Sequence, residues 1–180
     1  LMNELTEPTP YLTAKGIQVH SGVYTDEAKR LTCIPATDIE GNIWTVQYIA
    51  EDGTKRFAKN SKKEGCFHVL GGLDKLANVP VIVIAEGYAT AATIKEATEL
   101  PAVVSAFDSG NLKSVAKVLH EKYPHIPMMI AADDDKHLEL SKGMNPGKEK
   151  ATEAVMAVNG MIILPTFAPN EQSENPRKFS

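Results

Sequence analysis

The sequence lacks the features that mark several large protein classes. It has only two cysteines, Cys33 and Cys66, and no CxxC pair, so a zinc ribbon is not encoded. No apolar run approaches the roughly 20 residues of a membrane span, and the first ten residues show no signal peptide. Two free thiols are the simpler prediction, with a Cys33–Cys66 disulfide as the alternative. These absences predict a cytoplasmic protein with no membrane partner.

The sequence also lacks an excess of basic residues. The net charge is −4, the sequence pI is about 5.8, and 43% of the residues are hydrophobic. These values are ordinary for a globular protein and exclude one whose whole surface binds nucleic acid, although a local basic patch remains compatible with them. The 180 residues suffice for one good-sized domain or two small ones. The abrupt ends, Leu-Met and Arg-Lys-Phe-Ser, lead us to expect a piece of a longer protein.

The first part of the chain reads as a series of short strands. β-rich runs at 30–38, 42–50, 51–57 and 65–72 are separated by turns, including one at Gly41. This pattern predicts a small antiparallel, β-rich (α+β) subdomain over residues 1–78.

The pattern changes near residue 78 to long apolar runs that alternate with helical segments. Strands are predicted at 81–85, 102–107, 126–132 and 161–165, and helices at 88–99, 111–123 and 147–158. The order βαβαβαβ predicts an α/β domain over 79–180, with a mostly parallel four-stranded sheet and helices on both faces.

Acidic residues follow two of these predicted strands. Glu86 comes directly after the first, and Asp133, Asp134 and Asp135 come after the third. Function in such sheets gathers beyond the carboxyl ends of the strands. Because side chains alternate along an extended chain, Asp133 and Asp135 are predicted to share a side with Glu86, whereas Asp134 points elsewhere. Such a cluster favours a hard dication such as Mg²⁺. Taken alone, Glu86 fits a helix N-terminal charge and the aspartates fit a solvated turn, so the hypothesis rests on their pairing.

The segments "VIVIAEGYATAATI" and "MMIAADDD" resemble the Toprim domain shared by DnaG-type primases, type IA and type II topoisomerases and some nucleases. The resemblance covers residues 79–165 and implies that Glu86, Asp133 and Asp135 are catalytic and hold Mg²⁺ or Mn²⁺. The segment "AFDSGNL" resembles the loop beside the metal site in primases, which implies nucleotide contacts for Gly110 and Asn111. The segment "NPGKEKATEA" resembles the start of the following helix in primase-like members, which implies a similar role for Lys148.

The first part of the chain is similar to the region that precedes Toprim in TraC-type primases of conjugative plasmids and in phage primases. The matching positions are Lys15, Gly16, Pro35, Asp38, Gly41, Gln47, Asp52, Gly53, Lys55, Arg56 and Phe57. The resemblance implies the catalytic core of a DNA primase, which makes short RNA primers from NTPs on single-stranded DNA in plasmid or phage replication or conjugation. It also implies helicase or relaxase domains as partners. The recruiting module and helical region of such primases are not in this sequence. We therefore expect that the isolated chain could synthesise little primer.

The window 54–63 concentrates positive charge and contains no acidic residue. Its cations and its one aromatic residue are Lys55, Arg56, Phe57, Lys59, Lys62 and Lys63. A solvated face is the simpler interpretation, but beside an acidic site the window predicts a track for template and triphosphates, with Phe57 stacking on a base. Gly87 is expected to let a phosphate approach closely. Trp44 is interpreted as a core residue. A Toprim nuclease and a non-catalytic single-stranded-DNA-binding module remain as alternative functions.

Overall fold

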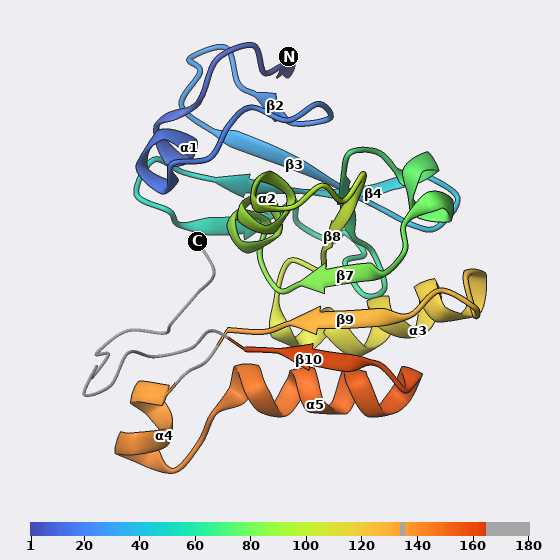
Figure 1. The fold of residues 1–180 in the computed structure, drawn as a ribbon. Coiled ribbons are helices and arrows are strands. Elements are labelled where there is room, and N and C mark those ends of the chain that lie inside the picture. The colour runs from blue at the N-terminus through green and yellow to red at the C-terminus, as the bar shows by residue number, and fades with distance from the viewer. Residues whose placement is uncertain (134–135, 165–180) are drawn as a thin grey trace.

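The computed structural model describes residues 1–133 and 136–164, which form a mixed α/β fold with two sheets (Figure 1). The first sheet contains β1 (Asn3–Glu4), β2 (Tyr24–Thr25), β3 (Thr32–Thr37), β4 (Ile43–Ile49) and β5 (Lys55–Phe57). The second contains β6 (His68–Leu70), β7 (Ile82–Ala85), β8 (Val103–Ser105), β9 (Met128–Ala131) and β10 (Met161–Ile163). The helices are α1 (Pro10–Lys15), α2 (Tyr88–Ala97), α3 (Leu112–Lys122), α4 (Lys136–Lys142) and α5 (Pro146–Val158), with 3-10 turns η1 (Leu73–Asn78) and η2 (Ser109–Asn111).

The first sheet is antiparallel, as the sequence predicts, with its strands in chain order from β1 to β5. β4 is typical of a sheet with one covered face: Thr45, Gln47 and Ile49 are buried, and the residues between them are not. Helix α1 lies against the covered face through Tyr11 and Leu12 and was not predicted from the sequence. β5 is an edge strand, so in the described residues no further strand pairs with its outer edge.

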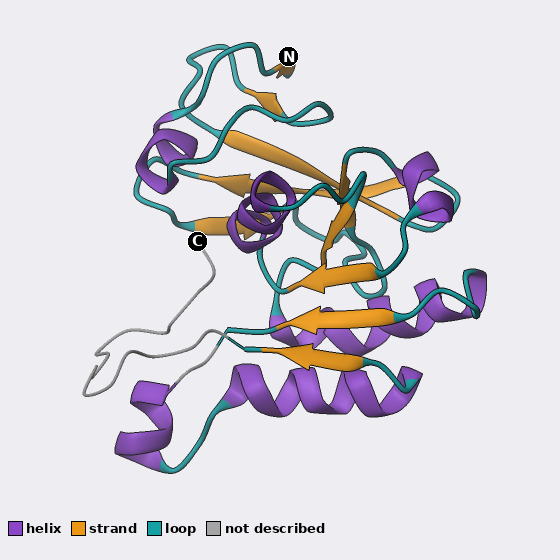
Figure 2. Cartoon of the chain, viewed as in Figure 1, coloured by secondary structure: helices purple, strands orange, loops and turns teal. Residues whose placement is uncertain are grey.

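The second sheet has the order β10-β9-β7-β8-β6. The four strands predicted from the apolar runs pair in parallel, which confirms the predicted mostly parallel arrangement among them. Helices α3 and α5 cover one face and α2 covers part of the other (Figure 2). The carboxyl ends of β7 and β9 therefore lie side by side, with Ala85 opposite Ala131.

One sequence interpretation is wrong: the run 65–72 does not end the first sheet. Its strand β6 pairs antiparallel with β8, so the second sheet has five strands in the described residues instead of the predicted four. β6 also connects the two sheets, because Thr37 of β3 forms a bridge with Phe67 just before β6. Pairing between segments more than 30 residues apart depends on tertiary packing, which local patterns do not report.

Buried groups hold this junction together. The His68 ring Nδ1 donates a hydrogen bond to the carbonyl oxygen of Pro35, at 3.1 Å, and so joins β6 to β3. Burial lowers the pKa of His68 to about 4, which keeps the ring neutral near pH 7. Cys33 and Cys66 are both buried and free, which confirms the simpler of the two cysteine predictions.

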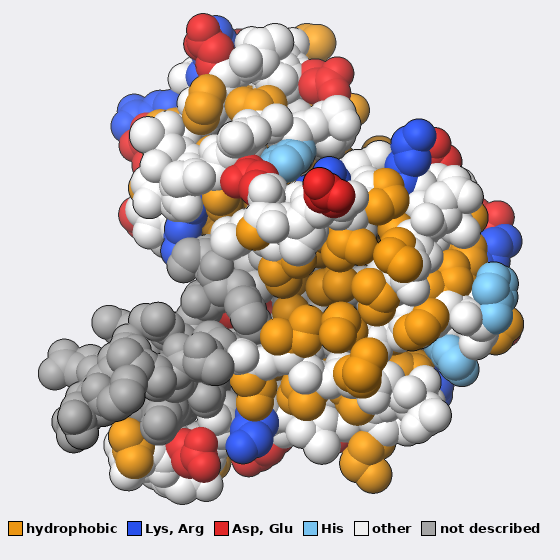
Figure 3. Space-filling model, in the orientation of Figure 1, with side chains coloured by type: hydrophobic (Ala, Val, Ile, Leu, Met, Phe, Trp, Pro, Cys, Tyr) orange, Lys and Arg blue, Asp and Glu red, His pale blue; other side chains and the backbone are white. Residues whose placement is uncertain are grey.

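A part of the second sheet that α2 does not cover exposes apolar side chains. Figure 3 shows hydrophobic side chains gathered over β7, β9 and β10. Met161 is 52% exposed, although its register partner Met129 is partly covered. None of the helices in the described residues is both long and apolar enough to cross a membrane.

Candidate active site

Glu86 and Asp133 lie next to each other at the carboxyl edge of the second sheet. Glu86 directly follows β7, and Asp133 follows the neighbouring strand β9 after one intervening residue. The backbone N–H of Asp133 donates a hydrogen bond to Oε2 of Glu86, at 3.0 Å. Both residues are only 7% exposed, so two carboxylates share a largely water-excluded corner. The structure thus brings together two members of the predicted acidic cluster.

The third predicted member, Asp135, lies outside the described residues, as does Asp134. Within 1–133 and 136–164, no group of three or more His, Cys, Asp or Glu residues is arranged to hold a metal ion. The role of Glu86, Asp133 and Asp135 as ligands therefore stays a prediction.

A lysine of the first sheet reaches this corner. Lys55 begins β5, and its register partner is the buried Ile49, so it lies on the side of the first sheet that faces the second. A Cβ placed on Gly87 would lie 3.7 Å from Nζ of Lys55. An ammonium group therefore lies beside Glu86 and Gly87 at the start of α2, and its positive charge partly offsets the negative charge of the two carboxylates.

Beside Lys55, two aromatic rings and an ion pair also connect the first sheet to the loop after β8. Phe57 of β5 packs edge-on against Phe107, with 5.4 Å between ring centroids. Lys63 lies over the Phe57 ring at 5.4 Å and donates a hydrogen bond to the carboxylate of Asp108. Phe107 has a φ of 75°, a strained value for a side chain of this size, and it turns the chain out of β8 toward Asp108.

Asn111 ties together the two loops that border the site. Its side-chain amide donates to the carbonyl oxygens of Cys66 and Ala106, both at 2.9 Å, and its Oδ1 accepts from the N–H of Gly65 at 2.9 Å. The residue is 3% exposed, so these bonds account for its position without a ligand. Gly110 lies beside it, and a Cβ there would be 3.4 Å from Oδ1 of Asp108. Nucleotide contacts of Gly110 and Asn111 stay predictions.

The basic window does not form a single track. Because neighbouring residues of a strand face opposite sides, Arg56 points away from the side that Lys55 and Phe57 share. Its guanidinium lies 5.0 Å from the centre of the Tyr48 ring on β4. Lys62 lies 5.0 Å from the centre of the Trp44 ring, and Lys59 is exposed in the connecting loop.

Trp44 itself corrects another sequence interpretation. It is 48% exposed and is not a core residue. The run "NIWTVQYIA" contains no charged residue, so the sequence alone does not show which set of alternating residues is covered.

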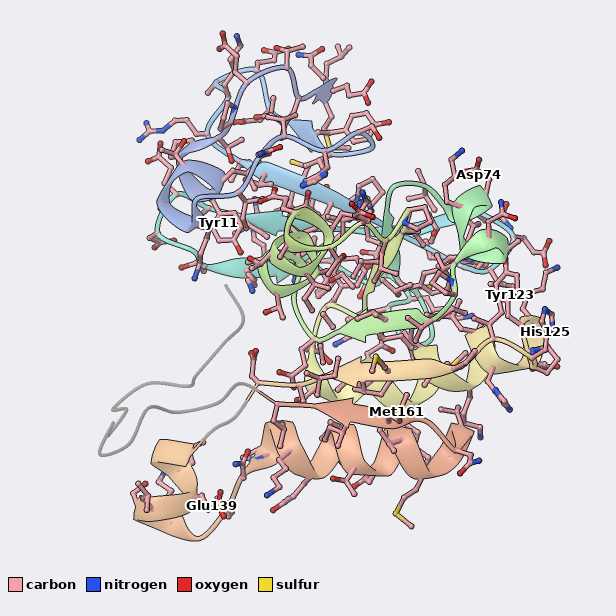
Figure 4. All side chains as sticks on the ribbon, viewed as in Figure 1. Tyr11, Asp74, Tyr123, His125, Glu139 and Met161 are labelled. Carbon is pink, nitrogen blue, oxygen red and sulfur yellow. The ribbon has the colours of Figure 1, made fainter. Side chains whose placement is uncertain are left out.

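Lys148 is placed at the start of α5, where its N–H donates to Oδ1 of Asn145 at 3.2 Å. It lines a hollow of about 460 Å³ between α4 and α5, together with Glu139 and Glu149. Figure 4 labels Glu139 on α4, at the opposite end of the molecule from the first sheet. A contact of Lys148 with nucleotide stays a prediction.

Comparison with known proteins points to primases. The chain is 59% identical over 169 residues to an Escherichia coli protein named DNA primase TraC, and the match covers 94% of this chain and 16% of that protein. The chain thus spans about one sixth of the length of that curated relative. No model of a known protein family matches the chain.

Solved structures with a similar fold are also primases. The primase fragment of the bacteriophage T7 primase-helicase protein has a TM-score of 0.60 at 16% identity, covering 92% of this chain and 66% of that chain. The DnaG primase catalytic domain bound to ssDNA has a TM-score of 0.50 at 11% identity, covering 91% of this chain and 54% of that chain. At these identities the likeness shows that the chain shares the fold of primase catalytic cores.

Proposed function

We propose that the chain is part of the catalytic core of a plasmid-type DNA primase, which joins NTPs into short RNA primers on a single-stranded DNA template. The observation that carries the proposal is the pair of buried carboxylates, Glu86 and Asp133, with the basic residue Lys55 of another sheet at its edge. The 59% identity to a DNA primase TraC supports this assignment. Residues 79–180 are then a Toprim domain, preceded by a subdomain over residues 1–78 whose strand β6 is added to the Toprim sheet, and the protein acts in plasmid replication or conjugation.

The donor atoms suit Mg²⁺ or Mn²⁺. Both ligand candidates offer only carboxylate oxygens, which hard dications prefer, and both sit where few water molecules compete. Glu86 and Asp133 would hold the ion together with Asp135. When bound, the ion would supply charge stabilisation for the phosphates of the incoming nucleotide.

The residues of this chain position the reactants. Nζ of Lys55, beside Gly87, is placed to bind a triphosphate or template phosphate close to the carboxylates. Lys63 is half-buried between Phe57 and Asp108, which fixes a second positive charge beside the site. Because phosphoryl transfer depends mainly on positioning and electrostatics, no protein nucleophile is needed.

A primer-synthesis assay separates this function from its alternatives. The chain is incubated with single-stranded DNA, labelled NTPs and Mg²⁺ or Mn²⁺. Labelled oligoribonucleotides that disappear with Asp133→Ala support the primase. Shortened DNA would instead identify a Toprim nuclease, and retarded DNA without either product would identify a binding module. Addition of a helicase or relaxase domain from the same replication system tests whether such a partner stimulates synthesis.

A further inference from the structure

Asp108 lies at the same edge of the second sheet as Glu86, after the neighbouring strand. β8 pairs in parallel with β7, with Ser105 opposite Ala85, and the N–H of Ala106 donates to the carbonyl oxygen of Ala85 at 2.9 Å. The chain therefore leaves β8 beside the point where Glu86 follows β7. A further carboxylate, whose side chain is 42% exposed, thus stands at the edge that carries the buried acidic pair.

The two carboxylate oxygens of Asp108 have different partners. Oδ1 accepts a hydrogen bond from the backbone N–H of Asn111 at 3.0 Å and so caps the 3-10 turn η2. Oδ2 accepts a hydrogen bond from Nζ of Lys63, with which Asp108 forms an ion pair. One oxygen therefore fixes the carboxylate to its own loop, and the other holds a lysine from the loop between β5 and β6.

The backbone just before Asp108 is held in one conformation. Phe107 has a φ of 75°, which a side chain of this size adopts only where the surrounding packing enforces it. Its ring is 4% exposed and packs edge-on against Phe57. The direction of the Asp108 carboxylate is therefore set by the fold and by the cap of η2, and it does not depend on the contact with Lys63.

Lys63 is the partner that gains its position from this contact. Its side chain is long and belongs to a loop, but Nζ lies 5.4 Å from the centre of the Phe57 ring and is bonded to Asp108. A lysine that is already ordered loses less freedom when it binds a ligand. Because an ammonium group carries three N–H donors, the bond to Oδ2 leaves donors for a second anion.

We infer that Asp108 is a positioning residue for the proposed reaction, which holds the ammonium group of Lys63 where the triphosphate of the incoming nucleotide meets the carboxylates. The inference rests on the proposed function. Asp108 acts through Lys63 and needs no contact with the nucleotide itself. Phosphoryl transfer depends on charges that are in place before the reaction, and Asp108 gives a loop lysine one such place.

Asp108→Asn separates the two tasks of the carboxylate. Asparagine caps as well as aspartate does, so its oxygen can keep the bond from Asn111, but its amide nitrogen then presents only donors to Lys63. The urea concentration at half-unfolding should therefore equal that of the parent chain. At saturating template the rate of primer synthesis should fall about threefold, as expected for the loss of a partly exposed ion pair. The template concentration for half-maximal synthesis should not change.

The matched control is Asp26→Asn. Oδ1 of Asp26 also accepts backbone hydrogen bonds, from the N–H groups of Arg30 and Leu31, both at 2.9 Å. Asp26 follows β2, which β3 and β4 separate from β5 in the first sheet. Primer synthesis by this variant should equal that of the parent chain. A rate loss equal to that of Asp108→Asn would overturn the inference.

A double-mutant cycle shows whether Asp108 acts through Lys63. If it does, Asp108→Asn costs nothing further in a Lys63→Ala chain, and the double variant is as slow as either single variant. A combined loss of about ninefold would show two independent roles and would overturn the inference. Faster synthesis by Asp108→Asn would also overturn it, because Asp108 would then mask Lys63 instead of positioning it.

Binding of ATP in the presence of Mg²⁺, followed by isothermal titration calorimetry, provides a readout that does not need synthesis. Asp108→Asn, Lys63→Ala and their double variant should each bind ATP about threefold more weakly than the parent chain. This result without primer synthesis would support the inferred role of Asp108 and refute the proposed function. Primer synthesis with unchanged ATP affinity in Asp108→Asn would overturn the inference and leave the proposed function intact. A parent chain that binds no ATP would also overturn the inference.

Discussion

Two charged regions meet at the candidate site, and they are built in different ways. The acidic region consists of side chains that are 7% exposed and joined by a backbone hydrogen bond to a neighbouring strand. The basic region consists of mostly exposed lysines and one arginine on an edge strand and the loop after it. Buried carboxylates are costly and have one geometry, whereas exposed cations adapt to a flexible polyanion. The contrast supports the proposal that the second sheet carries the chemistry and the first sheet binds the template.

The largest expected effect comes from the acidic region. Glu86→Gln removes one negative charge but keeps an oxygen that can accept the hydrogen bond from Asp133. We expect primer synthesis to fall by at least about 100-fold, because ligand charge is central to holding a divalent ion. Mn²⁺ binding, followed by isothermal titration calorimetry, should weaken in parallel.

The matched control is Glu96→Gln, a surface carboxylate on α2 that pairs with His20 instead. Its primer synthesis and Mn²⁺ affinity should equal those of the parent chain. Normal Mn²⁺ binding by Glu86→Gln would remove the acidic region from the proposed mechanism.

The second prediction concerns the connection between the two regions. Asn111→Ala leaves the N–H of Gly65 and two buried carbonyls without their side-chain partner. Unsatisfied buried groups of this kind cost about 2–4 kcal/mol in total, which we expect to see in urea unfolding. Asn3→Ala, at an exposed position in β1, should change stability by less than about 0.5 kcal/mol. Equal stability of the two variants would contradict the structural role of Asn111.

These two cases show what the sequence could and could not predict. The acidic pair was predictable, because Glu86 and Asp133 each end an apolar run and parallel strands place such ends on one edge. Asn111 was assigned to nucleotide binding from the loop "AFDSGNL". The hydrogen-bond partners of its side chain include Gly65 and Cys66, which lie 45 or more residues earlier in the chain, and no local sequence pattern predicts such contacts.

The helices and strands show the same contrast between local patterns, which are predictable, and long-range pairing, which is not. The predicted helix 111–123 is observed as Leu112–Lys122, and the predicted strand 161–165 as Met161–Ile163. The partner of β6 was missed, because a three-residue strand can add to either sheet. Helix α1 was missed as well, although Thr9 as its N-cap, Pro10 at its start and Gly16 at its end are recognisable signals.

The third prediction tests the junction through pH. The pKa of His68 is about 4 in the folded chain, and an exposed histidine titrates near 6.5. The unfolded chain therefore binds more protons between these values, and stability should fall as the pH drops through this range. Between pH 7 and pH 5 the expected loss from His68 is about 2 kcal/mol in urea unfolding. His68→Asn keeps a donor for Pro35 but does not titrate, so its loss should be smaller by that amount; an unchanged pH dependence would contradict the assignment.

The smallest expected effects distinguish two adjacent lysines of the basic region. Lys63 contacts Phe57 and Asp108 beside the site, and Lys62 lies over Trp44 instead. Both side chains are partly solvated, so each alanine variant should lose no more than about 1 kcal/mol of stability. At saturating template, Lys63→Ala should lower the rate of primer synthesis about threefold, because a cation near the reacting phosphates is lost. Lys62→Ala should leave that rate unchanged and only raise the template concentration required for half-maximal synthesis. Identical kinetics for the two variants would show that the cations form one continuous surface, and the division between chemistry and strand binding would then fail.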